Sequence, residues 1–225
     1  MAGLGERVTE PLRVRALLEG AILLPGGTLA LDALLAAAVA LRDALPPCSV
    51  QGVTPIEVPI QREPGGRFHL ASFAEWVPDE YEVRYVNRRF PIPEAQMLGD
   101  KKLRRIAINA GAQKSYRIPH EAIHVEGDVL AWWCVGDAEA IRELLALVTH
   151  LGKRRAVGSG RVREWLVEPC ETWDGFPVMR EGRPLRNLPP DWPGLASGVE
   201  VAAANLTYPY WERHREEVCA VPDGR

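Results

Sequence analysis

Two helical patterns with the same spacing of apolar residues constrain the fold of this chain most. The first follows Thr28 and the second follows Asp137, and each has apolar residues at i, i+3, i+4, i+7 and i+10. One face of each helix must therefore be buried against another element. The apolar positions are Leu31, Leu34, Leu35, Ala38 and Leu41 in the first helix, and Ile141, Leu144, Leu145, Val148 and Leu151 in the second.

Cap and breaker residues predict where both helices begin and end. Thr28 and Asp137 are suitable N-cap residues, because their side-chain oxygens can accept a hydrogen bond from the first turn. Pro46-Pro47 is expected to end the first helix, and Gly152 to end the second. His150 would then lie at the C-terminus of the second helix.

Strand-like stretches stand on both sides of each helix. Residues 12–18 alternate, which predicts a half-buried strand with Arg13 and Arg15 on its open face. Residues 129–135 suit a central strand. Residues 160–169 suit a returning strand, with Trp165 at a bulge. Shorter strands are expected near residues 57–61 and 68–73.

Two strand–helix–strand halves pack most simply as an α+β, ferredoxin-like (RRM-like) sheet with both helices on one face. The chain has 225 residues, enough for one domain with embellishments or two small ones. We expect a domain over 1–169 with a basic insertion at about 76–118. The Pro- and Trp-rich segment 170–225 would form an irregular tail packed on the domain or on a partner.

Several functional classes are disfavoured by composition. No apolar run is long enough to span a membrane and the N-terminus lacks a signal pattern, which predicts a cytoplasmic protein. The four cysteines lie far apart without a C-x-x-C pair, so buried thiols are expected rather than disulfides. A zinc site built from these scattered ligands is the alternative; otherwise no metal or cofactor is expected. The cysteines are Cys48, Cys134, Cys170 and Cys219.

Positive charge is concentrated in two stretches of a chain whose net charge is −3. Residues 83–118 hold nine basic residues against two acidic ones, and residues 153–163 hold five against none. Crowding like charges costs stability, so this segregation indicates an anionic partner, a solvated charged face being the alternative.

The second basic stretch begins in a glycine-rich segment, residues 152–161. Its order of glycine and lysine fits neither a P-loop nor a dinucleotide-binding turn. Gly158 and Gly160 can instead bring backbone amides close to a phosphate. Two basic segments with interleaved aromatic residues such as Tyr85 and Tyr116 favour a polynucleotide over a small phosphate compound.

Several stretches together resemble a known family. They are "TLALDALLAAA" at 28–38, "AQKSYRIP" at 112–119, the helix and glycine-rich loop at 137–162, and "RPLRNLPPDW" with "YPYWERH" in the tail. The chain is similar to Cas-five-like RAMP-superfamily subunits of type IV CRISPR antiviral complexes. It departs from them at Ser159, where an aromatic residue is expected between the two glycines.

The resemblance implies a non-catalytic subunit that holds the 5′ handle of the guide RNA. It implies the CRISPR backbone and large subunits as partners, with target-flanking DNA as a further contact. The glycine-rich loop would hold the RNA and the basic insertion would form a thumb-like projection, with weaker contacts on the open sheet face. The implied RNA-binding residues are Lys153, Arg154, Arg155, Gly158, Ser159, Gly160, Arg161, Lys101, Lys102, Arg104, Arg105, Lys114, Tyr116, Arg117, Arg13 and Arg15.

A metal-independent endoribonuclease that trims repeat RNA is the alternative function. Some RAMP proteins cut RNA with histidine, tyrosine or lysine in general acid–base roles. His124 and His150 are the candidates here, and His120 and His124 are expected on the same face of a strand. No convergent pair is evident, so binding without catalysis is the first interpretation.

Overall fold

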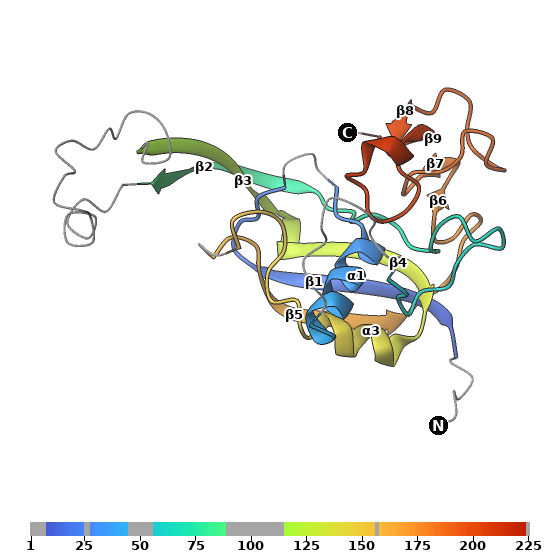
Figure 1. The fold of residues 1–225 in the computed structure, drawn as a ribbon, viewed down its shortest axis with the longest axis horizontal. Coiled ribbons are helices and arrows are strands. Elements are labelled where there is room, and N and C mark those ends of the chain that lie inside the picture. The colour runs from blue at the N-terminus through green and yellow to red at the C-terminus, as the bar shows by residue number, and fades with distance from the viewer. Residues whose placement is uncertain (1–7, 25–27, 45–55, 89–114, 156–157, 224–225) are drawn as a thin grey trace, which may run out of the picture.

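A computed structural model describes residues 8–24, 28–44, 56–88, 115–155 and 158–223. Within these ranges the protein is an α+β structure of mostly antiparallel strands with two α-helices (Figure 1). The larger elements are β1 (Glu10–Glu19), α1 (Leu31–Arg42), β2 (Pro78–Arg88), β3 (Tyr116–Val125), β4 (Val129–Gly136), α3 (Ala138–Leu145) and β5 (Arg161–Pro169). The smaller ones are η2 (Glu126–Asp128), β6 (Met179–Arg180), β7 (Arg183–Pro184), β8 (Val201–Ala204), η4 (Arg213–Arg215) and β9 (Glu217–Ala220).

The central sheet has the order β4-β1-β5, and both pairs are antiparallel. The predicted alternation in β1 is confirmed: Leu12, Val14, Ala16 and Leu18 are buried, and Arg13 lies on the open face. The prediction of regular strands near residues 57–61 and 68–73 is wrong. Instead, that part of the chain follows the outer edge of β4 through isolated antiparallel bridges, such as Ala71 with Cys134.

Both helices lie on one face of the sheet and contact each other (Figure 1). The start of α1 differs from prediction, because Ala30 rather than Thr28 occupies the N-cap position and no side chain caps the helix. The buried face is also rotated from the predicted one. Leu41 is 66% exposed, whereas Asp32 is only 2% exposed. A carboxylate therefore lies in the buried face of an otherwise apolar helix.

The second helix begins as predicted, since the carboxylate of Asp137 accepts a hydrogen bond from the Ala140 amide at 3.1 Å. It ends at Leu145, six residues earlier than predicted. Val148 and Leu151 remain buried although they follow the helix. His150 is consequently not at a helix terminus; it forms an isolated bridge with Arg161.

The bulge in β5 lies two residues before the predicted position. Leu17 pairs with Glu164 and Leu18 pairs with Val162, so Arg163 is the extra residue. Trp165 keeps its place in the ladder, and its indole N–H donates to the carbonyl of Val148 at 2.9 Å.

β2 lies in the predicted insertion, whereas β3 continues to Val125, beyond the expected end at about 118. The two strands form an antiparallel ribbon that projects away from the central sheet (Figure 1). Its inner end is attached to the body through a bridge between Ile123 and Ile22, whose backbone groups exchange two hydrogen bonds of 2.8 and 2.9 Å. No helix among the described residues is long and apolar enough to cross a membrane.

The C-terminal segment contains the short pairs β6-β7 and β8-β9 and has an apolar core of its own. Phe68, from the segment at the edge of β4, belongs to this core and packs against Trp192 with ring centroids 5.3 Å apart. The tail is thereby packed on the domain. The buried members of the core are Phe68, Val178, Met179, Leu188, Ala204, Leu206, Cys219 and Val221.

Candidate nucleic-acid interface

The glycine-rich loop lies against the segment that follows β1. Gly152 and Gly160 both have positive φ, and a Cβ would collide with the carbonyl oxygen of Leu23 at Gly152 and with that of Leu151 at Gly160. Gly158 also has positive φ, but its missing Cβ would point into open space. Two of the three glycines are therefore required by close backbone packing, and the third by backbone conformation alone.

The amides of this loop already have acceptors within the protein. Gly158 N–H donates to the carbonyl of Arg155 at 3.0 Å, and Gly160 N–H donates to that of Ala21 at 3.1 Å. A phosphate cradle built from these two amides would have to replace these hydrogen bonds, and it stays a prediction. Ser159 and Gly160 are buried as well. The charged side chains of the loop, in contrast, are open to an anion.

Those side chains are exposed. Lys153, Arg154 and Arg155 form no ion pair with any carboxylate that the structure describes, and Arg154 adopts φ of 61°. A non-glycine residue in this region of the backbone is uncommon and costs roughly 1–3 kcal/mol. Three adjacent uncompensated charges are the strongest electrostatic feature of the loop.

Arg154 joins the loop to the projecting ribbon. Its Nη2 lies 3.3 Å from Nε2 of His120 in β3. A guanidinium can only donate, so the contact requires a neutral imidazole with its proton on Nδ1. His120 was missed as a site residue from the sequence. The available signal was its position beside the K-x-Y-R-x-P segment, on the strand that returns from the basic insertion.

The ribbon divides the other predicted contacts between its two faces. Arg84 pairs with His120, and Tyr116 shares their face. Arg117 points from the opposite face, where its guanidinium carbon lies 3.9 Å from the ring centroid of Tyr85. The structure therefore brings the loop together with one ribbon face only, and Arg117 belongs to the other.

Three arginines of the sheet that were predicted to bind RNA either pair with a carboxylate or lie far from the loop. Arg15 forms an ion pair of 2.6 Å with Glu168, and Arg161 forms one of 3.2 Å with Glu19. Arg13 lies over the ring of Trp133, with 5.9 Å between guanidinium carbon and centroid. Six residues of strand separate Arg13 from the loop end of β1, about 20 Å. Lys101, Lys102, Arg104, Arg105 and Lys114 lie outside the described residues.

The histidines of the nuclease alternative have separate surroundings. His124 Nε2 lies 3.5 Å from the carboxylate of Glu82, and His150 Nδ1 lies 3.0 Å from the Thr149 hydroxyl. His120 and His124 share one face of β3, as predicted. No hydrogen bond joins His124 to His150 within the described part of the chain. Nor do the described residues contain a group of three or more His, Cys, Asp or Glu side chains able to hold a metal ion.

A protein-family model described as CRISPR type IV associated protein Csf3 matches residues 80–222. The chain belongs to this Csf3 family. The match takes in the ribbon, the glycine-rich loop and the tail, and it confirms the resemblance to Cas5-like subunits of type IV effectors. Membership in the family implies a place in a type IV CRISPR complex. No curated protein matches the chain.

Proposed function

We propose that this Csf3-family chain is a non-catalytic RNA-binding subunit that holds the 5′ handle of the guide RNA in a type IV CRISPR ribonucleoprotein. The contact between Arg154 and His120 carries the proposal, because it joins the loop's uncompensated charges to one face of the projecting ribbon. An arginine fork can bind a phosphate through two hydrogen bonds. Tyr116, partly exposed on the same ribbon face as His120, offers a stacking surface for an unpaired base.

The proposed core is ferredoxin-like. The sheet order β5-β1-β4, continued by the edge segment that bridges to β4, matches the order expected for two strand–helix–strand halves. Both connections place a helix on the same face of this sheet. The opposite face is partly covered by the tail, where Trp173 packs against Trp133 at 5.7 Å. This supports a role for the loop and ribbon, rather than the open sheet face, in holding RNA.

The proposed protein partners are the backbone and large subunits of the complex, with target-flanking DNA as a further contact. Family membership supports the assembly. Exposed apolar side chains on the tail offer surface for it: Val201 is 56%, Trp211 62% and Val218 63% exposed. These three side chains lie outside the charged loop, so a subunit contact there need not compete with RNA.

The test is binding of a labelled repeat-derived RNA to the purified chain. The double variant Arg154→Glu/Arg155→Glu should weaken binding strongly, and the matched exposed variant Arg183→Glu in the tail should not. Three phosphate contacts on a single strand give a log–log salt slope of about −2, which is about a 20-fold loss of affinity between 50 and 200 mM salt. Equal binding by both variants, or binding insensitive to salt, would contradict the proposal.

The same RNA, incubated in EDTA, tests the alternative. A discrete cleavage product that disappears in His124→Ala or His150→Ala would replace the binding role with a metal-independent endoribonuclease. Intact RNA recovered at full binding saturation supports the non-catalytic role.

A further inference from the structure

Strand β8 has one edge without a partner among the described residues. On its other side β8 pairs with β9, and Ala220 of β9 exchanges hydrogen bonds of 2.8 and 3.0 Å with Leu188 on the side away from β8. The β8-β9 pair lies in the tail, away from the central sheet (Figure 1). β8 is therefore the outer strand of a small sheet.

The register shows which backbone groups of β8 point to this open edge. The amide of Val221 donates to the carbonyl of Glu200 at 2.9 Å, so these two residues form a hydrogen-bonded pair, and every second residue of β8 also bonds to β9. Val201 and Ala203 lie between these residues, so their N–H and C=O groups point outward. These four groups have no hydrogen-bond partner in the part of the chain that the structure describes.

The open edge lacks the features that usually prevent another strand from joining. Natural edge strands are commonly protected by a charged residue, a proline or a bulge. β8 instead has the sequence Val-Ala-Ala-Ala and pairs with β9 without a register shift. Val201 is 56% exposed, and Val218, opposite Ala203 on the same face, is 63% exposed. An added strand would therefore find both unpaired backbone groups and apolar surface.

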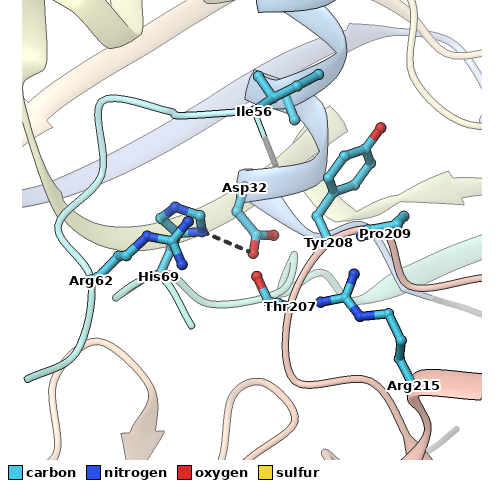
Figure 2. Close-up of a pocket in the computed structure, with 9 residues that line it drawn as sticks. Asp32, Ile56, Arg62, His69, Thr207, Tyr208, Pro209 and Arg215 are labelled. Atoms are coloured by element: carbon cyan, nitrogen blue, oxygen red, sulfur yellow. Dashed lines mark ion pairs between the residues drawn. The ribbon is translucent and has the colours of Figure 1, made fainter. Parts of the chain in front are cut away.

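The chain that follows β8 is fixed to the domain. The carbonyl of Leu206 accepts a hydrogen bond from the buried Arg186, and the Tyr210 hydroxyl donates to Asp32 of α1 at 2.9 Å. Thr207 and Asp32 line the same small cavity between the tail and α1 (Figure 2). Because β8 is held in place by these contacts, an added strand would gain its hydrogen bonds without first ordering the edge.

The core side of the edge indicates which strand fits. Ala202 lies opposite the buried Cys219, yet it is itself exposed at the edge. An antiparallel strand would place one residue opposite Ala202, at about 4.5 Å between Cα atoms. A large apolar side chain there would extend the tail core over the alanine. A second copy of β8 could pair its Ala203 with Val201, but it would place only another alanine opposite Ala202.

The small size of the contact indicates where the strand comes from. A pair of four-residue strands buries much less than the about 1,000 Å² of a stable interface. Such a contact suits a segment that other contacts already hold nearby, because proximity raises its effective concentration. The other subunits of a type IV CRISPR complex meet this condition.

We propose that β8 accepts an extended strand from another protein subunit of the type IV complex, with a large apolar side chain opposite Ala202. The inference rests on the proposed contact between the tail and other subunits, and it does not depend on RNA binding.

Hydrogen exchange resolved at single residues tests the proposal. The isolated chain is compared with the complex purified from cells that co-express all its subunits and a guide RNA. The amides of Val201 and Ala203 should exchange about tenfold more slowly, or slower still, in the complex. The amides of Ala202 and Ala204 are internal controls, because they bond to β9 in both samples.

A proline at the edge provides the second measurement. Ala203→Pro removes an outward N–H and leaves the bonds to β9 in place, since proline is tolerated where the N–H faces away from the sheet. In competition with the unmodified chain it should enter the complex about tenfold less, because a hydrogen bond is lost and the ring obstructs the added strand. Ala203→Ser keeps the N–H and should enter normally.

Thermal unfolding verifies that both variants are folded. Both should bind labelled repeat RNA like the unmodified chain, so a failure of the proposed RNA-binding function is distinguished from a failure of strand addition. The proposal is overturned if Val201 and Ala203 exchange equally fast in both samples, or if Ala203→Pro enters the complex as well as Ala203→Ser. It is also overturned if the isolated chain dimerises and thereby protects the same amides, since a second copy would then be the occupant.

Discussion

The hydroxyl of Tyr210 donates a hydrogen bond to the carboxylate of Asp32 at 2.9 Å, across 178 positions of the sequence. Arg186 Nη2 donates to the same hydroxyl at 3.0 Å, and its two terminal nitrogens also donate to the carbonyl oxygens of His69, Ala71 and Leu206. An ion of the first helix is thus balanced by two residues of the tail. The tail is anchored to the domain by buried charge as well as by apolar packing.

Replacing Asp32 with asparagine should destabilise the protein by about 3–5 kcal/mol, because it leaves the guanidinium of Arg186 buried without its counter-ion. Denaturant unfolding measures the change. The matched control is Asp43→Asn, which removes an exposed carboxylate that pairs with Arg42 at the end of the same helix. The control should have little effect. Similar losses in the two variants would contradict a structural role for the buried pair.

The same group predicts how stability depends on pH. The pKa of Asp32 is lower in the folded protein than in the unfolded chain, so its contribution is fully present above the ordinary aspartate pKa of about 4. It is lost as the pH falls through the lower folded value. The free energy of unfolding, measured from pH 7 to pH 2, should therefore fall less steeply below about pH 4 in Asp32→Asn than in the unmodified chain. Parallel curves would exclude Asp32 as the group responsible.

Local sequence patterns correctly predicted those features of the fold that depend only on residues close together in the chain. The alternation of β1 and the Asp137 cap of α3 are examples, since each depends on residues within one strand or one turn. The buried face of α1 was predicted incorrectly for the opposite reason. Asp32 is buried because Arg186 and Tyr210 compensate it, and helical periodicity contains no information about partners so distant in sequence.

In the candidate site, too, local sequence patterns could not predict contacts between residues far apart in the chain. Glycine and charge content located the loop and its exposed cations. The inward-facing position of Ser159 and the placement of Arg117 on the far face of the ribbon depend on strand register and on close contacts with the segment after β1. Pairing of Arg15 with Glu168 likewise depends on the β1–β5 register, which the composition of either strand does not specify.

Alanine substitutions should distinguish two glycines of the loop. Gly158→Ala places a Cβ in open space at a positive φ, which should cost about 1–2 kcal/mol of stability. Gly160→Ala adds a collision with the carbonyl of Leu151 to the same backbone penalty and should cost clearly more. Denaturant unfolding of both variants measures the difference. Equal losses would mean that the loop moves away from Leu151 at little cost.

Arg154 and His120 should differ in how they affect RNA binding. Arg154→Ala removes a charge, so it should lower affinity and reduce the salt slope by about 0.7, the value for one phosphate on a single strand. His120→Ala removes only the acceptor that orients Arg154. It should therefore lower affinity less and leave the slope unchanged. His214→Ala, an exposed histidine of the tail, is the control and should alter neither quantity.

If His120→Ala instead reduces the slope as much as Arg154→Ala does, His120 itself carries charge to the RNA. The neutral imidazole that the present contact requires would then not persist in the complex. If Arg154→Ala leaves the slope unchanged, Arg154 does not contact phosphate. The contacts would then have to come from Lys153 and Arg155, or from the Tyr85 and Arg117 face of the ribbon.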